Sequence, residues 1–547
     1  MTVAYRYIER LKRLLRREEG TIVKDWGGRL PVVLAYPNTY YVGMSSLAIH
    51  ALYRLFNQRR DIVCERVFHS LEAHKREDTL PLSVESQRPM HEFSVIAFTV
   101  SYELDYFHIV DMLRRAGIPL LTAQRDESWP LLLAGGPAVS ANPEPLADII
   151  DAFAIGEAEA LLPSLLELLP EACRSERSHA LHLLATVPGI YVPALKNAPV
   201  RRLWQRDLNL QPAITQIYTP HTEFGDRGLI EIGRGCWRGC RFCLAGFIYR
   251  PTRYVGLEAI LDAAHQVQMH RDRVGLVSAA VNDHPQIDQL VTELRRMGLK
   301  VAVSSLRVDA VSETLVQALA ESDTQTLTLA PEAGSPRLRQ LINKPQDDTR
   351  LFEVVEMAAR YGFPQVKMYF MVGHPGETEA DVEAIVDLVA AVRARFPRHL
   401  VINATPYVPK PHTPFQWAAM ASIDTLVARI AYLEKRLQRM RVTVRSDSPT
   451  WAAVEGVLAR GDRRLGAVLT AMKRVSLQEW KRAMKHAGLS AEEFLRARSY
   501  DEVLPWAVVD SGVAQSFLAR ERQRAQETMT QSALDEIPER KEKSYPG

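Results

Sequence analysis

The sequence predicts an α/β protein that begins with a Rossmann-like, doubly wound parallel sheet, continues into a partial (β/α)6 barrel and ends in a helical region. Three observations support this prediction. Short apolar runs rich in β-branched residues alternate with helical segments over residues 21–195, and the same alternation returns over residues 226–420. Beyond residue 420 the helical periodicity continues without strand-like runs, to about residue 520.

The composition is that of a globular protein with a large core. The chain has 547 residues, of which 47% are hydrophobic and 24% charged, and its formal net charge is +3. This length predicts more than one domain, and this charge gives no reason to expect nucleic acid as the substrate. No apolar run is long enough to span a membrane, and residues 1–20 lack the apolar core of a signal peptide. We therefore expect a cytoplasmic protein with no membrane partner.

The N-terminal segment, residues 1–20, is basic. It predicts an amphipathic helix that docks on the next domain, because Ile8, Leu11 and Leu15 share one face. The first domain, residues 21–195, follows with strands and helices in alternation. Its candidate strands are residues 31–36, 95–100, 131–134 and 149–155, and its candidate helices are residues 45–56 and 104–116. Ligands of such sheets bind beyond the carboxyl ends of the strands.

The second half of the chain starts with a linker, residues 196–225, that is rich in turn signals. Residues 226–420 are too few for an eight-unit barrel, so six strands are expected, the first near residues 228–232. The other candidate strands are residues 274–280, 300–304, 325–330, 365–371 and 400–405. Residues 421–520 predict a helical region. Residues 521–547 are dominated by Arg, Glu and Gln and predict a disordered charged tail.

Three of the five cysteines lie in one short loop. Cys236, Cys240 and Cys243 form a CxxxCxxC pattern directly after the first barrel strand, among glycines that let the backbone fold inward. Thiolates are the soft ligands that iron–sulfur clusters require. Three thiolates on a four-iron cubane leave one iron open, and that open iron is available for chemistry.

Two other interpretations of this loop are weaker. A structural zinc site needs four ligands, but no fourth cysteine lies nearby, and His221 and His265 are not at ligand spacing. Buried structural cysteines would not be interleaved with three arginines. Cys64 and Cys173, the two remaining cysteines, are expected in the core rather than as ligands.

The pattern Cys236-x-x-x-Cys240-x-Phe242-Cys243 resembles the signature of the radical S-adenosylmethionine (radical SAM) superfamily, which has an aromatic residue before the third cysteine. The resemblance implies a 4Fe-4S cluster on the three cysteines, whose free iron is chelated by S-adenosyl-L-methionine. It also implies that an electron from a donor such as flavodoxin or ferredoxin cleaves this cofactor to methionine and a 5′-deoxyadenosyl radical. The protein then supplies position and excludes water.

The same resemblance implies contacts to S-adenosylmethionine at the carboxyl ends of the barrel strands. The residues at the matching positions are Phe242, Ser304, Arg307, Glu332, Ser335 and Gly373. Structural roles remain open for two of them, because Glu332 is also placed to cap a helix and Ser335 to act as an N-cap. Arg234 and Lys367 are expected at the surface or behind the site rather than as catalysts.

The loops that follow the strands of the first domain resemble those of the cobalamin-binding domains that often precede a radical SAM barrel. The contacts implied by this resemblance are Tyr40, Gly43, Ser101, Gly135, Gly136 and Gly156. Cobalamin proteins that ligate cobalt through histidine carry DxHxxG after the first strand, and Tyr40 stands at that histidine position here. A bound cobalt is therefore expected to lack a protein imidazole. The alternative is that the domain keeps the fold without the cofactor.

A proline-rich strip, residues 407–417, follows the last barrel strand. It predicts a rigid loop that closes one side of the active site. Lys410, His412 and Gln416 in this strip are candidates for contact with the substrate. A purely structural clasp is the equal alternative.

Over about residues 25–521 the chain resembles a family of fused cobalamin-binding-like and radical SAM proteins. The first hypothesis is a radical SAM enzyme that uses cobalamin for methyl transfer or radical relay on an unknown substrate. The second is a cobalamin-free radical SAM enzyme that modifies RNA as methylthiotransferases do, although those proteins bring three more cysteines. The third is a non-enzymatic scaffold that carries the cluster.

Overall fold

The computed structural model describes residues 3–71 and 79–535. Its first domain is built on a six-stranded sheet of order β2-β1-β3-β4-β5-β6, in which all neighbours are parallel except β5 and β6. The strands are β1 (Leu30–Thr39), β2 (Ile62–Ser70), β3 (Val95–Thr99), β4 (Leu131–Gly135), β5 (Ala152–Ala154) and β6 (Ile190–Tyr191). This confirms the predicted doubly wound sheet.

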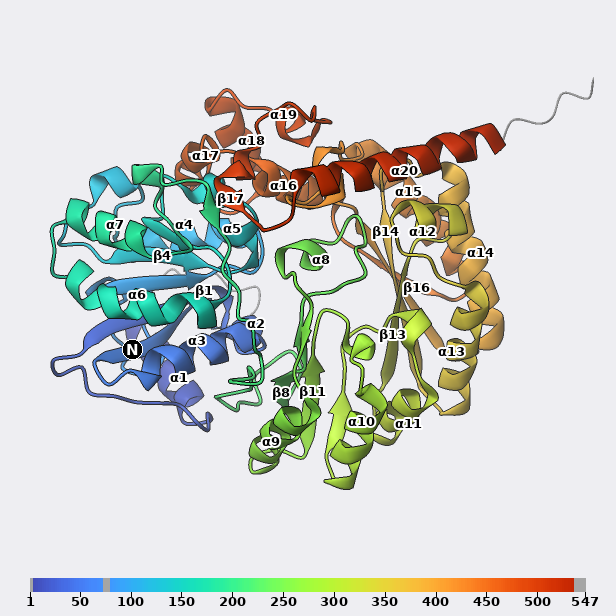
Figure 1. Cartoon of the computed structure of the whole chain (residues 1–547), viewed down its shortest axis with the longest axis horizontal. Coiled ribbons are helices and arrows are strands. Elements are labelled where there is room, and N and C mark those ends of the chain that lie inside the picture. Colours follow the sequence, from blue (N-terminus) through green and yellow to red (C-terminus); the bar gives the residue numbers. More distant parts are fainter. Residues whose placement is uncertain (1–2, 72–78, 536–547) are drawn as a thin grey trace, which may run out of the picture.

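Helices cover both faces of this sheet (Figure 1). Along β1, Val32 and Leu34 belong to one core and Val33 and Ala35 to another, so the strand is buried on both faces as parallel strands are. The first core is completed by α1 (Val3–Leu15), α3 (Leu47–Gln58), α6 (Ala158–Ala172) and α7 (Arg177–Thr186). The second is completed by α4 (Asp105–Arg115) and by α16 (Pro449–Arg460), α17 (Leu465–Ala471) and α18 (Leu477–His486) from the far end of the chain.

Strand β2 is absent from the sequence prediction. Charged Glu65 and Arg66 interrupt its apolar pattern, so it does not read as a buried strand. In the structure Arg66 is fully buried, and its guanidinium lies 2.6 Å from the carboxylate of Glu18 and 2.7 Å from that of Glu85. These partners come from distant parts of the chain, so the compensation is a tertiary feature that local pattern does not reveal.

The second domain is a partial barrel of two parallel sheets. One has the order β12-β11-β8 and the other the order β13-β14-β15-β16, and a bridge between Leu306 and Leu329 connects them. The strands are β8 (Gly228–Glu231), β11 (Arg273–Val277), β12 (Lys300–Ala302), β13 (Thr326–Glu332), β14 (Gln365–Val372), β15 (His399–Pro406) and β16 (Thr443–Ser446). The first six match the predicted barrel strands. Strand β16 extends the sheet beyond the predicted end of the barrel at residue 420.

An outer layer of helices packs on the barrel strands. It consists of α9 (Leu257–Gln268), α10 (Ile287–Arg296), α11 (Glu313–Glu321), α13 (Asp348–Arg360), α14 (Glu379–Arg395) and α15 (Ile423–Gln438). Side chains that point outward from the strands, such as Val366, Met368 and Ile402, are fully buried against these helices. Their neighbours on the same strands point into the barrel, because side chains alternate along a strand.

The last helix, α20 (Gln515–Asp535), crosses the top of the barrel (Figure 1). The expectation of a disordered tail from residue 521 is therefore wrong as far as Asp535, and residues 536–547 lie outside the described residues. Tertiary packing explains the difference, since Leu518 and Ala525 are fully buried and Glu521 pairs with Arg241.

The linker region is tied to the end of the chain. Strand β7 (Val200–Arg201) pairs in parallel with β17 (Val509–Asp510), which places residues 196–225 beside the C-terminal region. Among the described residues, no helix combines the length and apolar character needed to cross a membrane.

Candidate active site

The cysteine loop leaves β8 through the short strand β9 (Gly233–Arg234) and ends at helix α8 (Ala245–Ile248). Gly235 has φ +83°, and a Cβ there would lie 2.4 Å from the carbonyl oxygen of Tyr249, so only glycine fits this turn. The loop then closes on itself, because the amide of Cys243 donates to the carbonyl of Cys240 at 3.1 Å. These features turn the three cysteines toward one region.

The three thiols influence one another. Cys240 is 8% exposed, and Cys236 and Cys243 are half-buried. Burial raises the pKa of Cys243 to about 11, with a further contribution from the neighbouring Cys240 thiol. Burial also raises the pKa of Cys236. Metal ligation offsets such costs, because a bound metal holds the thiol as thiolate.

No group of three His, Cys, Asp or Glu side chains within residues 3–71 and 79–535 is arranged to hold a single metal ion. A cubane cluster differs from a single ion, because each of its thiolates binds a different iron and the sulfurs need not converge on one point. The three half-buried or buried sulfurs of this loop, with no further cysteine in the loop, fit a cluster with an open iron.

Arg307 lies beside this loop. Its Nη1 is 3.7 Å from the Sγ of Cys240, and its Nε is 3.2 Å from Asp309. Asp309 also accepts a hydrogen bond from Arg238, which forms two bonds to Asp283. The guanidinium of Arg307 therefore contacts the sulfur of one of the three loop cysteines directly.

Phe242 lies next to a buried group of polar atoms that lack hydrogen-bond partners. Its ring centroid is 5.6 Å from that of His374, which is 3% exposed and follows β14. The ring of Tyr407 also packs against His374, with the ring centroids 5.0 Å apart and the planes tilted by 31°. Neither ring nitrogen of His374 nor the hydroxyl of Tyr407 is hydrogen-bonded to any described residue. Burial lowers the pKa of His374 to about 3, so the ring is neutral and presents one donor and one acceptor.

These orphaned atoms fit the adenine of S-adenosylmethionine. A buried polar atom without a partner is costly, and the edge of a purine offers both donors and acceptors. The sequence prediction placed Gly373 here but missed His374 and Tyr407. The only sequence signal for His374 was its position directly after Gly373 at the end of a predicted strand.

The other residues assigned to S-adenosylmethionine have varied surroundings. Ser335 accepts a hydrogen bond from the amide of Leu338 and caps α12 (Pro336–Leu341), which is the structural role left open for it. Glu332 lies in β13 with φ +67°, and its carboxylate is 2.8 Å from Lys344. Ser304 is exposed after β12. The amide of Gly373 donates to Glu377 at 2.6 Å.

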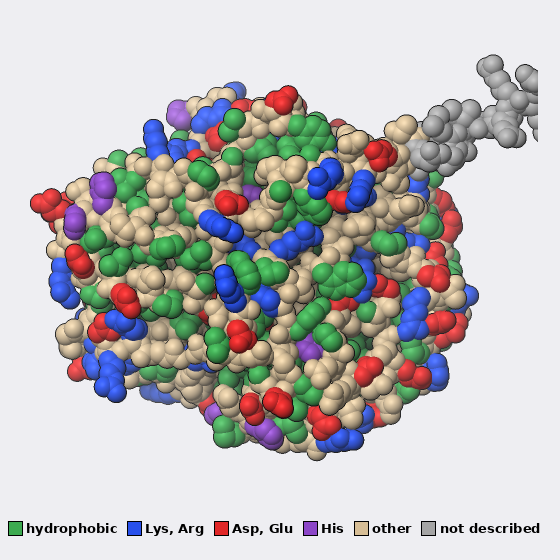
Figure 2. Space-filling model, in the orientation of Figure 1, with side chains coloured by type: hydrophobic (Ala, Val, Ile, Leu, Met, Phe, Trp, Pro, Cys, Tyr) green, Lys and Arg blue, Asp and Glu red, His purple; other side chains and the backbone are tan. Residues whose placement is uncertain are grey.

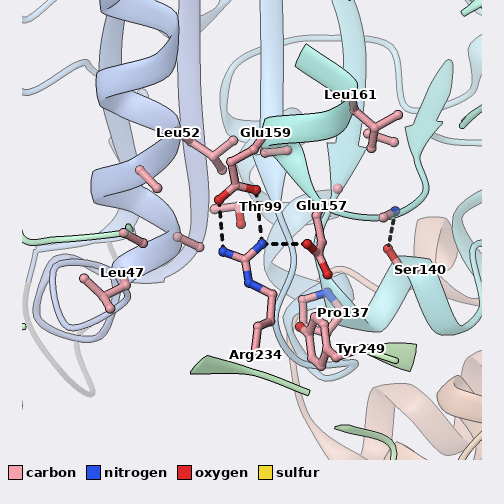
Figure 3. A pocket seen from close by; sticks show the side chains of 18 of the residues that line it. Leu47, Leu52, Thr99, Pro137, Ser140, Glu157, Glu159, Leu161, Arg234 and Tyr249 are labelled. Carbon is pink, nitrogen blue, oxygen red and sulfur yellow. Dashed lines mark hydrogen bonds and ion pairs between the residues drawn. The ribbon is translucent and has the colours of Figure 1, made fainter. Parts of the chain in front are cut away.

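A cavity of about 520 Å³ opens at the carboxyl edge of the first sheet (Figure 3). Gly135, Gly136 and Gly156, three of the residues that the resemblance assigned to cobalamin, line it. Gly156 has φ +130°, and a Cβ there would lie 2.1 Å from the carbonyl oxygen of Leu203, so only glycine fits at this position.

Three of the residues assigned to cobalamin lie elsewhere. Tyr40 starts the short helix α2 (Tyr40–Gly43), is 1% exposed and donates its hydroxyl to Glu18 at 2.6 Å. Gly43 packs against the ring of Phe68. Ser101 is exposed at the surface and does not line the cavity.

The floor of the cavity is apolar and its rim is charged. The floor lies between α3, α6 and the sheet, and its side chains are Leu34, Leu47, Leu52, Phe56, Leu133, Leu162 and Leu165. At the rim, Arg234 lies 2.9 Å from Glu157, 2.9 Å from Glu159 and 2.7 Å from Glu231. Tyr249 reaches the cavity from the segment after α8 (Figure 3). The cavity therefore has one wall from the sheet domain and one from the cysteine loop.

The side chains that line the cavity include neither histidine nor cysteine among the described residues. His50, on α3, is buried elsewhere, with Nε2 3.1 Å from the carbonyl oxygen of Met44 and Nδ1 bonded to the amide of Ile217. Arg234 was expected at the surface or behind the site, but it forms the rim.

The strip 407–417 clasps the domains together. The amine of Lys410 lies 2.7 Å from Glu103 and 2.7 Å from Glu455. His412 is 1% exposed, with Nε2 3.0 Å from the carbonyl oxygen of Ala141. Gln416 is fully buried and accepts hydrogen bonds from the amide of His412 and from Trp506, besides donating to Gln515. These contacts are those of the structural clasp that was the alternative to substrate contact.

Comparison with known proteins identifies the family. Residues 48–193 match the family described as Radical SAM proteins, N-terminal, and residues 230–389 match the Radical SAM superfamily. The chain is also 32% identical over 444 residues to the uncharacterized protein MJ0966 of Methanocaldococcus jannaschii, covering 80% of this chain and 90% of that protein. The chain belongs to the radical SAM superfamily. It is therefore a radical SAM enzyme, and its family implies a 4Fe-4S cluster, S-adenosylmethionine and an electron donor.

Two further likenesses concern the fold and part of the chain. The radical S-adenosylmethionine methyltransferase TsrM of Kitasatospora setae, solved with cobalamin and a 4Fe-4S cluster bound, shares the fold with a TM-score of 0.52, 14% identity and coverage of 93% of this chain and 99% of that one. The tRNA-2-methylthio-N(6)-dimethylallyladenosine synthase of Carboxydothermus hydrogenoformans is 26% identical over 227 residues, or 39% of this chain. The chain spans 50% of the length of that synthase.

Proposed function

We propose that this radical SAM enzyme holds its cluster on Cys236, Cys240 and Cys243, and that it binds cobalamin in the cavity of the first domain. Its reaction is then methyl transfer or radical relay, and it acts on a substrate held at the barrel. The observation that carries this proposal is that one cavity has walls from both the sheet and the cysteine loop. A cofactor in that cavity would lie beside the cluster.

The chemistry of the cavity fits a corrinoid. Its volume of about 520 Å³ is in the range of ligand pockets, and its leucine-rich floor suits the flat aromatic base of the nucleotide tail. The charged rim of Arg234 and three glutamates suits the amide groups around a corrin ring, since amides both donate and accept. The lack of histidine in the described lining supports a cobalt without a protein imidazole.

When bound, the cluster supplies one electron, S-adenosylmethionine a radical precursor, and cobalamin a transferable methyl group. The chain's own residues perform three tasks. Arg307 holds the Cys240 sulfur in place by direct contact, and His374 with Tyr407 orients the adenine edge. The buried ion pairs of Arg234 hold the sheet domain against the cysteine loop and exclude water from their junction. A flavodoxin or ferredoxin is the proposed electron donor.

The cobalamin half of the proposal is tested by filling the cavity. Ala48, exposed on α3, lines the cavity, so Ala48→Trp should place an indole where the cofactor tail would lie. After anaerobic reconstitution with hydroxocobalamin and desalting, the wild-type protein and the matched Ala48→Ser variant should keep the corrinoid absorption, and Ala48→Trp should lose it while keeping its iron. Equal corrinoid retention in all three proteins would refute the proposed site.

A second candidate is a cobalamin-free enzyme that modifies RNA. It is favoured by the likeness to the tRNA synthase and by basic side chains that gather in the middle of the face shown in Figure 2, where the sheet domain meets the barrel. Against it, the chain has only Cys64 and Cys173 to add to the loop cysteines, and Cys64 is fully buried. Retention of tRNA at physiological salt, with no corrinoid bound, would favour this candidate.

A further inference from the structure

The inner surface of the second barrel sheet is accessible rather than packed. On β14 the outward side chains of Val366 and Met368 are 0% exposed, whereas the inward side chains of Lys367, Tyr369 and Met371 are half-buried. A closed barrel fills its interior with branched apolar side chains. The alternation on β14 shows that this barrel instead surrounds a lumen that solvent reaches.

Polar side chains from three neighbouring strands lie on this inner surface. Tyr369, Asn403 and Arg445 are register partners on β14, β15 and β16, and register partners on parallel strands point to the same side. Lys367 stands two residues before Tyr369, and its amine donates to the Tyr369 hydroxyl at 3.1 Å. We call these four residues the lumen row.

The lumen row carries positive charge that the chain does not neutralise. Lys367 and Arg445 form no ion pair with any described residue. Two other lysines differ, since the buried Lys344 pairs with Glu332 and the half-buried Lys410 with two glutamates.

Two further polar groups lie on or beside these strands. Asp447 stands two residues after Arg445 and accepts a hydrogen bond from Thr405 at 3.0 Å. The Oδ1 atom of Asn403 is buried without a hydrogen-bond partner among the described residues. A half-buried ammonium without a carboxylate and an amide with an unused acceptor are both costly unless a ligand meets them.

We propose that the lumen row binds an anionic group of the substrate, a carboxylate or a phosphate. The Lys367 amine and the Arg445 guanidinium supply charge-assisted donors, and the Asn403 amide supplies a further donor while its oxygen accepts from a neighbouring hydroxyl or amine of the same substrate. This inference rests on the proposed function only in placing the substrate of a radical enzyme inside the barrel. It adds that the substrate carries an anionic group. A wholly apolar or cationic molecule would leave the charged donors of the lumen row without a partner.

The test uses the reconstituted full-length protein and two probe anions, benzoate and phenyl phosphate. Lys367 is acetylated with a limiting amount of an amine-reactive ester, and its extent of labelling is followed by peptide mass spectrometry as each probe is added. We expect a saturable protection of Lys367 that leaves exposed Lys481 unchanged. Stronger protection by benzoate assigns a carboxylate, and stronger protection by phenyl phosphate assigns a phosphate.

Two variants make the test specific. Arg445→Gln should raise the probe concentration for half-protection about tenfold, because it removes one charge-assisted contact. Arg474→Gln removes the same charge from an exposed position outside the barrel and should change nothing. Labelling of Lys367 that ignores both probes, or equal effects of the two variants, would overturn the inference. The iron content and 5′-deoxyadenosine formation of the wild-type protein test the proposed function separately, because neither enters the labelling measurement.

Discussion

Arg234 and Glu157 form a buried ion pair, 2.9 Å between Nη1 and the carboxylate, that joins the strand before the cysteine loop to the loop after β5 of the sheet domain. Their side chains are 14% and 3% exposed. Arg253 lies 2.7 Å from the other oxygen of Glu157, so a single carboxylate of the sheet domain holds two arginines of the barrel. The cavity and the cluster site therefore keep a fixed relation to each other.

The first prediction concerns this junction. Arg234→Met should lower the free energy of unfolding by about 3 kcal/mol, because it removes the cation that pairs with the carboxylates of Glu159 and Glu231, although Glu157 keeps Arg253. Urea denaturation followed by circular dichroism measures the change. Arg482→Met removes an exposed arginine that pairs with Glu479 and should cost less than about 1 kcal/mol. Similar losses in the two variants would contradict a structural role for the junction.

The second prediction concerns the cluster ligands. Cys240→Ala should abolish iron binding after anaerobic reconstitution, because a cubane held by two thiolates is not retained. The sheet domain should stay folded, since Cys240 belongs to the barrel loop. Cys173→Ala, which removes a cysteine at the end of α6, should keep the full iron content. A Cys240→Ala protein with wild-type iron would show that the cluster assignment is wrong.

The third prediction separates ligand binding from stability at His374. His374→Phe removes two buried nitrogens that have no partner among the described residues, so the ligand-free protein should be as stable as the wild type or more stable by about 1 kcal/mol. Its affinity for S-adenosylmethionine should fall about tenfold, since the adenine edge loses a hydrogen bond. Calorimetric titration and thermal unfolding measure the two effects. A variant that loses stability but keeps its affinity would assign His374 to packing alone.

The fourth prediction concerns pH. The side chain of Glu377 is 0% exposed, and burial raises its pKa to about 7 although Arg429 and the amide of Gly373 contact one oxygen. A carboxyl whose folded pKa exceeds the unfolded value of 4.5 binds its proton more tightly in the folded state. Its stabilisation is complete below pH 4.5 and is lost as the pH rises through about 7, a difference of about 3 kcal/mol.

The matched variant for this pH effect is Glu377→Gln, which cannot titrate. The wild-type free energy of unfolding, relative to that of Glu377→Gln, should decrease between pH 5 and pH 8. Urea denaturation at several pH values gives both curves. Parallel curves over this range would show that the folded pKa of Glu377 lies near its ordinary value.

The sequence predicted those strands and helices that a short stretch of residues identifies without reference to tertiary contacts. The strand expected at residues 365–371 is β14, Gln365–Val372, because its apolar residues alone suffice to identify it. Strand β2 was missed, since only the distant partners Glu18 and Glu85 make its Arg66 acceptable in a core. Helix α20 was missed because its buried face exists only against the barrel.

The residues of the candidate site likewise fall into those that contiguous sequence identifies and those that depend on the tertiary structure. The CxxxCxxC loop is contiguous, so its cysteines could be named from the sequence. Tyr40 was placed at a ligand position because it matches the histidine position of the DxHxxG pattern, but the cavity lies between α3, α6 and the sheet and leaves that residue outside. Lys367 was expected at the surface or behind the site rather than as a catalyst. The register of β14 with β15 and β16 puts it on the same face of the sheet as Asn403 and Arg445, and that register is not visible in the local sequence.

The most direct test of the central claim is the stoichiometry of bound corrinoid and iron. The protein is reconstituted anaerobically with iron, sulfide and hydroxocobalamin, desalted, and measured by absorption and metal analysis. The account predicts one corrinoid and about four irons per chain, with 5′-deoxyadenosine formed when S-adenosylmethionine and reductant are added. A full cluster that forms 5′-deoxyadenosine but retains no corrinoid would contradict the role proposed for the cavity between the sheet and the cysteine loop.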